Sequence, residues 1–199
     1  MTQRKKDAVL ERIECAALAV FVQKGYLAAR VSDISARAGV SVGNIYRYYK
    51  NKDEIFYALL PQGFPDQLLS VIADKVGACR SGDPDAIGAM AESFIVFLLQ
   101  NRERIAILFT GTRGTAYECF EDSFAGTLLS IVQRIYEKEV SAYISRYGGD
   151  AVLREIYRNL IRMFGRILRL DCSQEEAERQ LRQLNLYHYH GITKLLNII

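Results

Sequence analysis

Apolar residues recur every three or four positions along most of the chain, which is the period of an amphipathic α-helix. Residues 5–24 carry the first such stripe, which consists of Val9, Ile13, Ala16, Ala17, Val20 and Phe21. Strand-like alternation of convincing length is missing from the sequence. The pattern therefore predicts an all-α fold.

Turn-forming and capping residues separate the first helices. Gly25 is expected to end the first helix in a left-handed conformation. A second helix is expected over residues 31–38, followed by a turn at Gly39. Ser41 and Asn51 are residue types that cap helices, so they predict the starts of a third and a fourth helix.

Proline and glycine then interrupt the pattern between residues 61 and 65. This break predicts two domains, residues 1–60 and residues 61–199. In the second domain, helices are expected over residues 66–79, 85–100, 102–110, 117–147, 151–170 and 174–196. The segment 85–100 is apolar nearly all round, which predicts burial on all sides.

The segment after the first helix has the layout of a helix-turn-helix. A short helix and a glycine turn lead into a second short helix that is rich in aromatic and basic residues. Gly43, Tyr46 and Arg47 are spaced to share one face of this second helix. Ile45 and Tyr49 share the other face, which is expected to pack on the rest of the domain.

A DNA-reading helix must bring its N-terminal end close to base edges. Gly43 adds no bulk there, Asn44 can donate to an adenine edge, and Val42 can touch a thymine methyl. Phosphate contacts should flank the reader. The residues expected to contact DNA are Ser32, Ser41, Val42, Gly43, Asn44, Tyr46, Arg47, Tyr48, Lys50 and Lys52.

Charge gives modest support for this interpretation. Residues 1–60 hold ten Lys and Arg against six Asp and Glu, whereas the rest of the chain is close to neutral. A basic head fits a polyanionic partner. Solvated surface charge explains so small an excess almost as well. The motif by itself also fits a helical hairpin whose tyrosines pack a core and whose lysines face water.

The combined pattern is more specific. It resembles the N-terminal domain of TetR/AcrR-family transcriptional regulators through Phe21, Gly25, Tyr26, Asp33, Ile34, Ala38–Ser41, Gly43, Ile45, Tyr46, Tyr49 and Lys52. The resemblance implies about nine helices: a three-helix helix-turn-helix domain, then a ligand-sensing domain whose last two helices form a homodimer. Arg30 departs from the family, which usually has Thr or Ser there to cap the second helix. Either Ser32 takes over the cap, or Arg30 reaches a phosphate.

The segment 151–170 carries apolar residues on more than the one stripe that a single core needs. Gly165 permits close approach, so the surplus face fits a partner helix, with a larger intrachain core as the alternative. The residues expected at the dimer interface are Ile156, Leu160, Phe164, Leu184 and Leu195. Two reading helices must lie about 34–36 Å apart to enter successive major grooves, which implies a palindromic double-stranded DNA operator.

A small-molecule site needs apolar walls and a few polar groups. The residues expected to line one are Phe94, Phe97, Leu98, Phe109, Arg113, Tyr117, Phe120, Phe124 and Met163. Plain core packing is an equally good interpretation of each. Arg113 and Glu118 carry opposite charges close together, so the identity and charge of the ligand stay open.

Other chemistry has little support in the sequence. The four cysteines are scattered, and His188 and His190 point in different directions on a helix, so neither a metal nor a cofactor is expected. Catalytic motifs are not apparent, so an enzyme is not expected. Apolar runs are too short for a membrane span, and a cytoplasmic location is expected.

These patterns together predict a DNA-binding transcriptional regulator of the bacterial type. We expect a repressor that an unknown small-molecule ligand releases from its operator. An all-α adaptor, or a nucleoid or cell-division DNA-binding protein without a small-molecule inducer, is the alternative. The sequence leaves repression and activation undecided.

Overall fold

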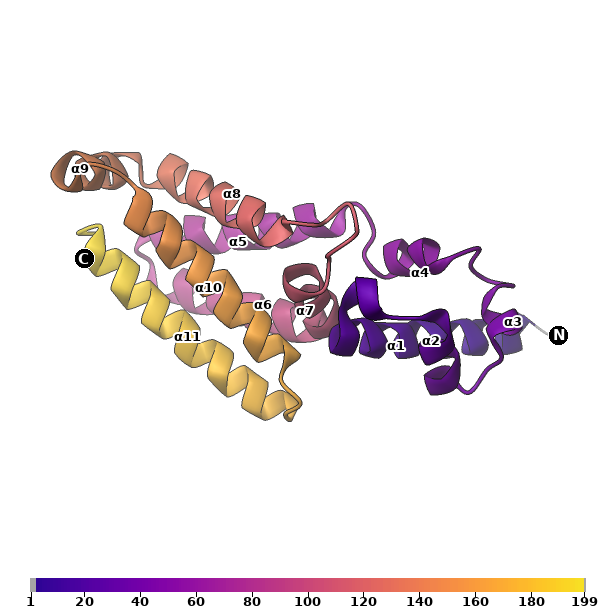
Figure 1. Ribbon diagram of the computed structural model, residues 1–199. Helices are drawn as coiled ribbons and strands as arrows, with labels where there is room; N and C mark the ends of the chain where they lie inside the picture. Colours follow the sequence, from indigo (N-terminus) through magenta and orange to yellow (C-terminus); the bar gives the residue numbers. More distant parts are fainter. Residues whose placement is uncertain (1–2, 199) are drawn as a thin grey trace.

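The computed structural model describes residues 3–198, with side chains from residue 6, and this range holds eleven α-helices and no strand. The first four helices gather at one end of an elongated molecule (Figure 1), and we call them the head. They are α1 (Gln3–Ala28), α2 (Val31–Ala38), α3 (Val42–Ile45) and α4 (Lys52–Leu59). The all-α prediction is confirmed.

The remaining helices form what we call the body. They are α5 (Phe64–Ser81), α6 (Pro84–Gln100), α7 (Arg102–Thr110), α8 (Phe120–Ile135), α9 (Glu137–Tyr147), α10 (Ala151–Arg169) and α11 (Gln174–Leu195). Helix α10 packs against α7, α8 and α11, and α5 packs against α6 and α8. The chain starts in the head and ends at the opposite end of the body (Figure 1).

Helix caps and a turn in the head lie where the sequence predicts them. Gly39 adopts a left-handed conformation (φ 62°) after α2. Ser41 Oγ accepts a hydrogen bond from the Asn44 amide at 3.2 Å, and Asn51 Oδ1 accepts one from the Glu54 amide at 2.8 Å. Each cap accepts from an amide in the first turn of its helix.

The predicted helix over residues 117–147 is wrong in its extent. Residues 111–119 form a loop that ends at Cys119 in a left-handed conformation (φ 66°), and α8 begins only at Phe120. Tyr136 then leaves the helical conformation (φ −115°, ψ 43°) and divides α8 from α9. Its ring is buried at this break, so packing overrides the continuous helical pattern.

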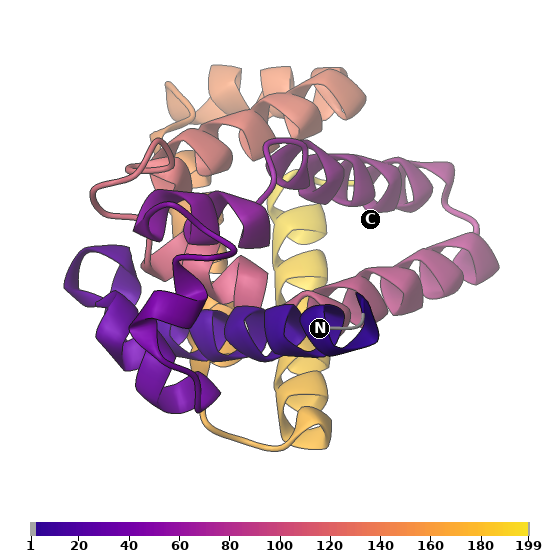
Figure 2. The same ribbon diagram turned by 90° about the vertical axis from the view of Figure 1, so that its right-hand side faces the viewer.

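One continuous core links head and body. Buried side chains belong to a single contact cluster that runs from Ile13 in α1 to Leu196 after α11. The Tyr26 amide donates to Gly111 O at 2.8 Å. Gly25 has a positive φ (72°), but its ψ of 165° is not the left-handed helical conformation that the sequence predicts, and α1 continues past this kink to Ala28. Figure 2, viewed from the head, shows α1 in front of the body with α5 and α6 to one side. The division at residue 60 stays a prediction.

None of the helices within residues 3–198 is long and apolar enough to cross a membrane. Within the same residues, no group of three or more His, Cys, Asp or Glu side chains is arranged to hold a metal ion.

Candidate nucleic-acid interface and ligand cavity

One side of α3 is fixed to the head. Ile45 is fully buried, and Tyr49 is buried one turn later. The Tyr49 hydroxyl donates to Glu14 Oε1 of α1 at 2.7 Å. Burial and this acceptor raise the pKa of Tyr49, so the hydroxyl keeps its proton and the bond. The predicted inward face of α3 is therefore confirmed.

The other side of α3 faces solvent. Gly43 has no heavy atom within 4 Å of where a Cβ would stand, and Val42 is exposed. Tyr46 is 51% exposed, and Arg47 is exposed beside it. Gly43, Tyr46 and Arg47 thus share an open surface as the spacing predicts. Their contact with DNA stays a prediction.

Lys50 and Lys52 were expected to act alike, but the structure separates them. The Lys50 side chain is 89% exposed, with one ion pair to Glu54 at 3.7 Å. The Lys52 ammonium donates to the carbonyls of Tyr26 (2.7 Å) and Ala29 (3.0 Å) and lies 4.2 Å from the Tyr26 ring centre. Lys52 therefore braces the connection between α1 and α2, which the sequence analysis did not anticipate.

Arg30 occupies the N-cap position of α2, so Ser32 does not take over the cap. The Arg30 amide donates to Asp33 Oδ2 at 3.0 Å. Asp33 also pairs with Lys24 at 2.9 Å, and these two interactions, the lysine first, hold the pKa of Asp33 below its usual value. The start of α2 is thus stabilised by an acidic residue three positions on rather than by a capping hydroxyl.

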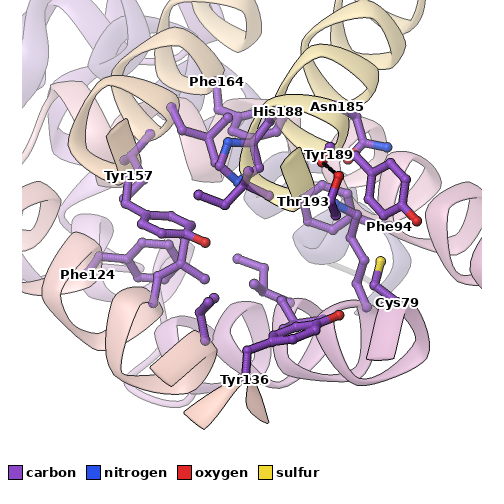
Figure 3. A pocket seen from close by; sticks show the side chains of 18 of the residues that line it. Cys79, Phe94, Phe124, Tyr136, Tyr157, Phe164, Asn185, His188, Tyr189 and Thr193 are labelled. Carbon is purple, nitrogen blue, oxygen red and sulfur yellow. Dashed lines mark hydrogen bonds between the residues drawn. The ribbon is translucent and has the colours of Figure 1, made fainter. Parts of the chain in front are cut away.

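A mainly apolar cavity of about 90 Å³ lies inside the body, between α5, α8, α10 and α11 (Figure 3). Of the residues that were expected to line a ligand site, four do so: Phe94, Leu98, Phe109 and Phe124. Phe94 and Leu98 come from α6, Phe109 from α7 and Phe124 from α8. Ligand binding at these four positions stays a prediction.

The other five expected lining residues lie elsewhere. Phe97 stacks on Phe64 at 6.5 Å between ring centres, and Met163 is exposed on the outer face of α10. Arg113 is exposed in the loop before α8, so it cannot serve as a charged group of the cavity. Tyr117 and Phe120 pack behind the cavity wall toward the head. These side chains have suitable chemistry for a ligand site, but Met163 lies on the outer face of its helix and Arg113 lies in a loop.

The polar lining of the cavity was missed. Figure 3 shows Cys79 of α5, Tyr157 of α10, and Asn185, His188, Tyr189 and Thr193 of α11 around it, with Tyr136 at the break between α8 and α9. Lys75 of α5 also lines it. A signal existed in the sequence, because Lys75 stands in the apolar stripe formed by Leu68, Ile72, Val76 and Cys79.

Burial shifts the pKa values of the titratable lining groups in the directions that favour their neutral forms. Burial lowers the pKa of Lys75, and burial with the nearby Lys75 charge lowers the pKa of His188 to about 4. Burial raises the pKa of the Cys79 thiol and of the Tyr157 hydroxyl. The cavity is therefore a place of low polarity in which any charge is costly.

The dimer prediction needs correction at three residues. Leu160, Phe164 and Leu184 are buried within the subunit, and Leu160 and Phe164 line the cavity. Gly165 is also used internally, since a Cβ there would lie 3.1 Å from Phe109 Cβ and 3.2 Å from Thr110 Cγ2 of α7. These positions complete the intrachain core, the alternative that the sequence left open.

A different face of α10 and α11 is exposed. Ile156 and Leu195 are half-buried, so these two predicted interface residues stay accessible. Large apolar side chains that are exposed on the same two helices include Val152, Met163, Leu186 (58% exposed) and Tyr187 (73% exposed). Large apolar side chains gathered on two adjacent helices are typical of a surface that another subunit covers.

The head of this chain matches a known family of proteins. Residues 15–59 match the family model described as bacterial regulatory proteins, tetR family. The chain is 31% identical over 109 residues to the HTH-type transcriptional repressor SCO4008 of Streptomyces coelicolor. The aligned region covers 55% of this chain and 52% of that protein. It is 31% identical over 94 residues to the HTH-type transcriptional activator FasR of Mycolicibacterium smegmatis. That aligned region covers 47% of this chain and 42% of FasR.

A solved structure aligns with this chain over most of its length. It is NalD of Pseudomonas aeruginosa, described as the secondary repressor of the MexAB-OprM multidrug efflux pump. The TM-score is 0.49 at 20% identity, covering 92% of this chain and 96% of that one. This chain spans about half the length of the curated relatives it matches. The head of this chain, over residues 15–59, is thus similar to the tetR family of bacterial regulatory proteins.

Proposed function

We propose that this protein is a transcriptional regulator that binds operator DNA through α3 of the head. One observation carries the proposal: α3 is locked by Ile45 and Tyr49, while Gly43, Tyr46 and Arg47 leave its other face open. A rigid helix with an open N-terminal end can approach base edges in a major groove. Arg47 and Lys50, both exposed, supply positive charge for phosphates at its margin.

The regulator acts as a homodimer with a palindromic operator. The exposed apolar face of α10 and α11 supports this, and Tyr187, Leu186 and Val152 are its most accessible members. A two-fold axis through this face pairs α10 and α11 with their copies in a four-helix bundle. Leu186→Glu is expected to give monomers in sedimentation analysis, whereas Met163→Glu, at the face's edge, weakens the dimer less.

Ligand binding in the body releases the DNA. Aromatic rings connect the cavity to the head: Phe120 packs on the cavity residue Phe124 at 5.2 Å, and Tyr117 packs on Phe120 at 6.1 Å. Tyr117 in turn contacts Tyr57 and Phe56 of α4 at 6.0 and 6.4 Å. A ligand that displaces the cavity wall thereby moves α4 and, through it, the head.

Binding to the promoter region next to its own gene tests the DNA-binding proposal. Arg47→Ala is expected to weaken binding to all sequences by about tenfold, because a phosphate contact is lost. Asn44→Ala is expected instead to change which operator variants are preferred. The control is Arg134→Ala, on the exposed part of α8, with no expected effect.

The same experiment separates the competing functions. Sequence-independent binding would support a nucleoid protein, and no binding at low salt would overturn DNA binding altogether. We propose repression, as in the Streptomyces relative, although the mycobacterial relative is named as an activator. A promoter–reporter fusion with and without the protein distinguishes the two, since only a repressor lowers expression when it binds.

A further inference from the structure

We propose that the cavity takes a small amphipathic anion, a short-chain apolar carboxylate, whose charged group pairs with Lys75. This inference rests on the proposed function in one respect, since it names the class of ligand for the regulatory cavity. It is carried by the position of one lysine and by the character of every group around it.

Lys75 is the charged group of the cavity. Its Nζ lies 4.9 Å from the centre of the Phe94 ring, among apolar walls. Within the described residues it has no ion pair, whereas Arg80, little more than one turn further along α5, pairs with Glu139. A buried ammonium without a counter-charge is costly, and the lowered pKa of Lys75 reflects that cost. A ligand that brings a negative charge would offset this cost of the buried ammonium.

The remaining lining groups offer no competing charge. Asp and Glu side chains are absent from the lining among the described residues. His188, with its lowered pKa, is a neutral imidazole at pH 7, and the raised pKa of Cys79 keeps its thiol protonated. A cationic ligand would therefore meet Lys75 without a compensating carboxylate, and an anionic ligand meets a single positive charge.

A second polar group is ready for a ligand head. Asn185 Oδ1 of α11 is buried and has no hydrogen-bond partner among the described residues. The Asn185 Nδ2 can donate to a carboxylate, and its unpartnered Oδ1 can accept from the protonated acid. The Tyr157 hydroxyl also points into the open space between the helices (Figure 3). Few polar groups among apolar walls fix the orientation of a single-headed ligand.

Size and access favour a short chain. At about 90 Å³ the cavity is smaller than the roughly 150 Å³ cavity that holds benzene, so about four to six non-hydrogen atoms fit without movement of the walls. The cavity adjoins an open surface hollow and shares Cys79, Tyr136, Tyr189 and Ile198 with it. A ligand can enter here between α5 and the end of α11, and longer chains can extend toward this opening.

Calorimetric titration of the full-length protein, without DNA, tests the proposal. The probes are butanoate, hexanoate and octanoate, each compared with the amide and the alkylammonium ion of the same length. The carboxylate is expected to bind at least about tenfold more tightly than the amide, because it makes a charge-assisted hydrogen bond to Lys75. The alkylammonium ion is expected to bind most weakly.

Two variants locate the effect. Lys75→Met keeps the length and apolar character of the stem, so it is expected to bind the amide as before and to lose the preference for the carboxylate. It should also raise the unfolding temperature, because it removes a buried charge. Lys138→Met, on the exposed surface of α9, is the control and should keep the wild-type preference.

The outcomes are decisive in both directions. The proposal is overturned if carboxylate and amide bind equally, if the ammonium ion binds best, if none of the carboxylates binds, or if Lys75→Met retains the preference. DNA binding by α3 is measured separately. Failure of Arg47→Ala to weaken DNA binding would therefore challenge the proposed function and leave the carboxylate preference standing.

Discussion

Two lysines in the head show how strongly position decides the role of a residue. Lys50 and Lys52 are two positions apart, yet one side chain extends into solvent and the other donates to two backbone carbonyls. A charge-assisted bond to a carbonyl is worth more than an exposed ion pair. Lys52 is therefore first a structural residue, and a phosphate contact can use only its third N–H group.

The pair gives a direct test. Lys52→Met is expected to lower the free energy of unfolding by about 1–3 kcal/mol, because it leaves the carbonyls of Tyr26 and Ala29 without their donor. Lys50→Met is expected to change it by less than about 0.5 kcal/mol, because that lysine is exposed. Urea unfolding measures both. Equal losses from the two variants would contradict the structural role of Lys52.

Two histidines give a second residue-scale prediction. His188 faces Tyr157 in the cavity at 5.2 Å between ring centres, whereas His190 is exposed. The pKa of His188 is about 4 in the folded protein against an ordinary value of 6.5, so the unfolded chain binds the extra proton between these values. Its contribution to stability is complete above pH 6.5 and is lost as the pH falls toward 4.

The loss amounts to at most about 3.5 kcal/mol, since each pKa unit corresponds to about 1.4 kcal/mol. His188→Asn should flatten the decline in stability between pH 6.5 and 4 relative to wild type, and His190→Asn should leave it unchanged. Chemical denaturation across this range measures the difference. An unaltered pH profile for His188→Asn would show that the imidazole is not buried as described.

At the scale of elements, periodicity predicts the helices well and their interruptions poorly. The starts of α2, α3 and α4 follow from local turn and capping chemistry, which involves residues within four positions of each other. The division at Tyr136 follows from a ring that is buried among distant helices, which a one-dimensional pattern does not contain. The close contact of Gly165 with α7 is also a tertiary contact, so the sequence pattern could not distinguish it from a contact with a partner subunit.

The close approach of α10 to α7 can be tested with two glycines. Gly165→Val is expected to destabilise the protein by about 1–3 kcal/mol, because the new atoms meet Phe109 and Thr110. Gly126→Val, on α8, has open space around it and should be neutral or slightly stabilising, since valine has the higher helix propensity. Thermal unfolding compares them, and a neutral Gly165→Val would contradict the packing.

At the scale of the whole molecule, the sequence could predict the open face of α3 and part of the cavity wall, but not the structural connection between them. The open face of α3 and four cavity residues follow from helical spacing. Lys75, Tyr157 and Asn185 come from three different helices, and only the tertiary fold brings them to one cavity. The ring contacts from Phe120 to Tyr117 and α4 likewise depend on a loop whose conformation the pattern does not specify.

The central claim is that paired heads present α3 to successive major grooves of an operator. Hydroxyl-radical footprinting on the promoter region next to the gene tests it most directly. We expect two protected patches centred about 34–36 Å apart and related by two-fold symmetry, and we expect Arg47→Ala to need about tenfold more protein for the same protection. A single patch, uniform protection without sequence preference, or a footprint unchanged by Arg47→Ala would contradict it.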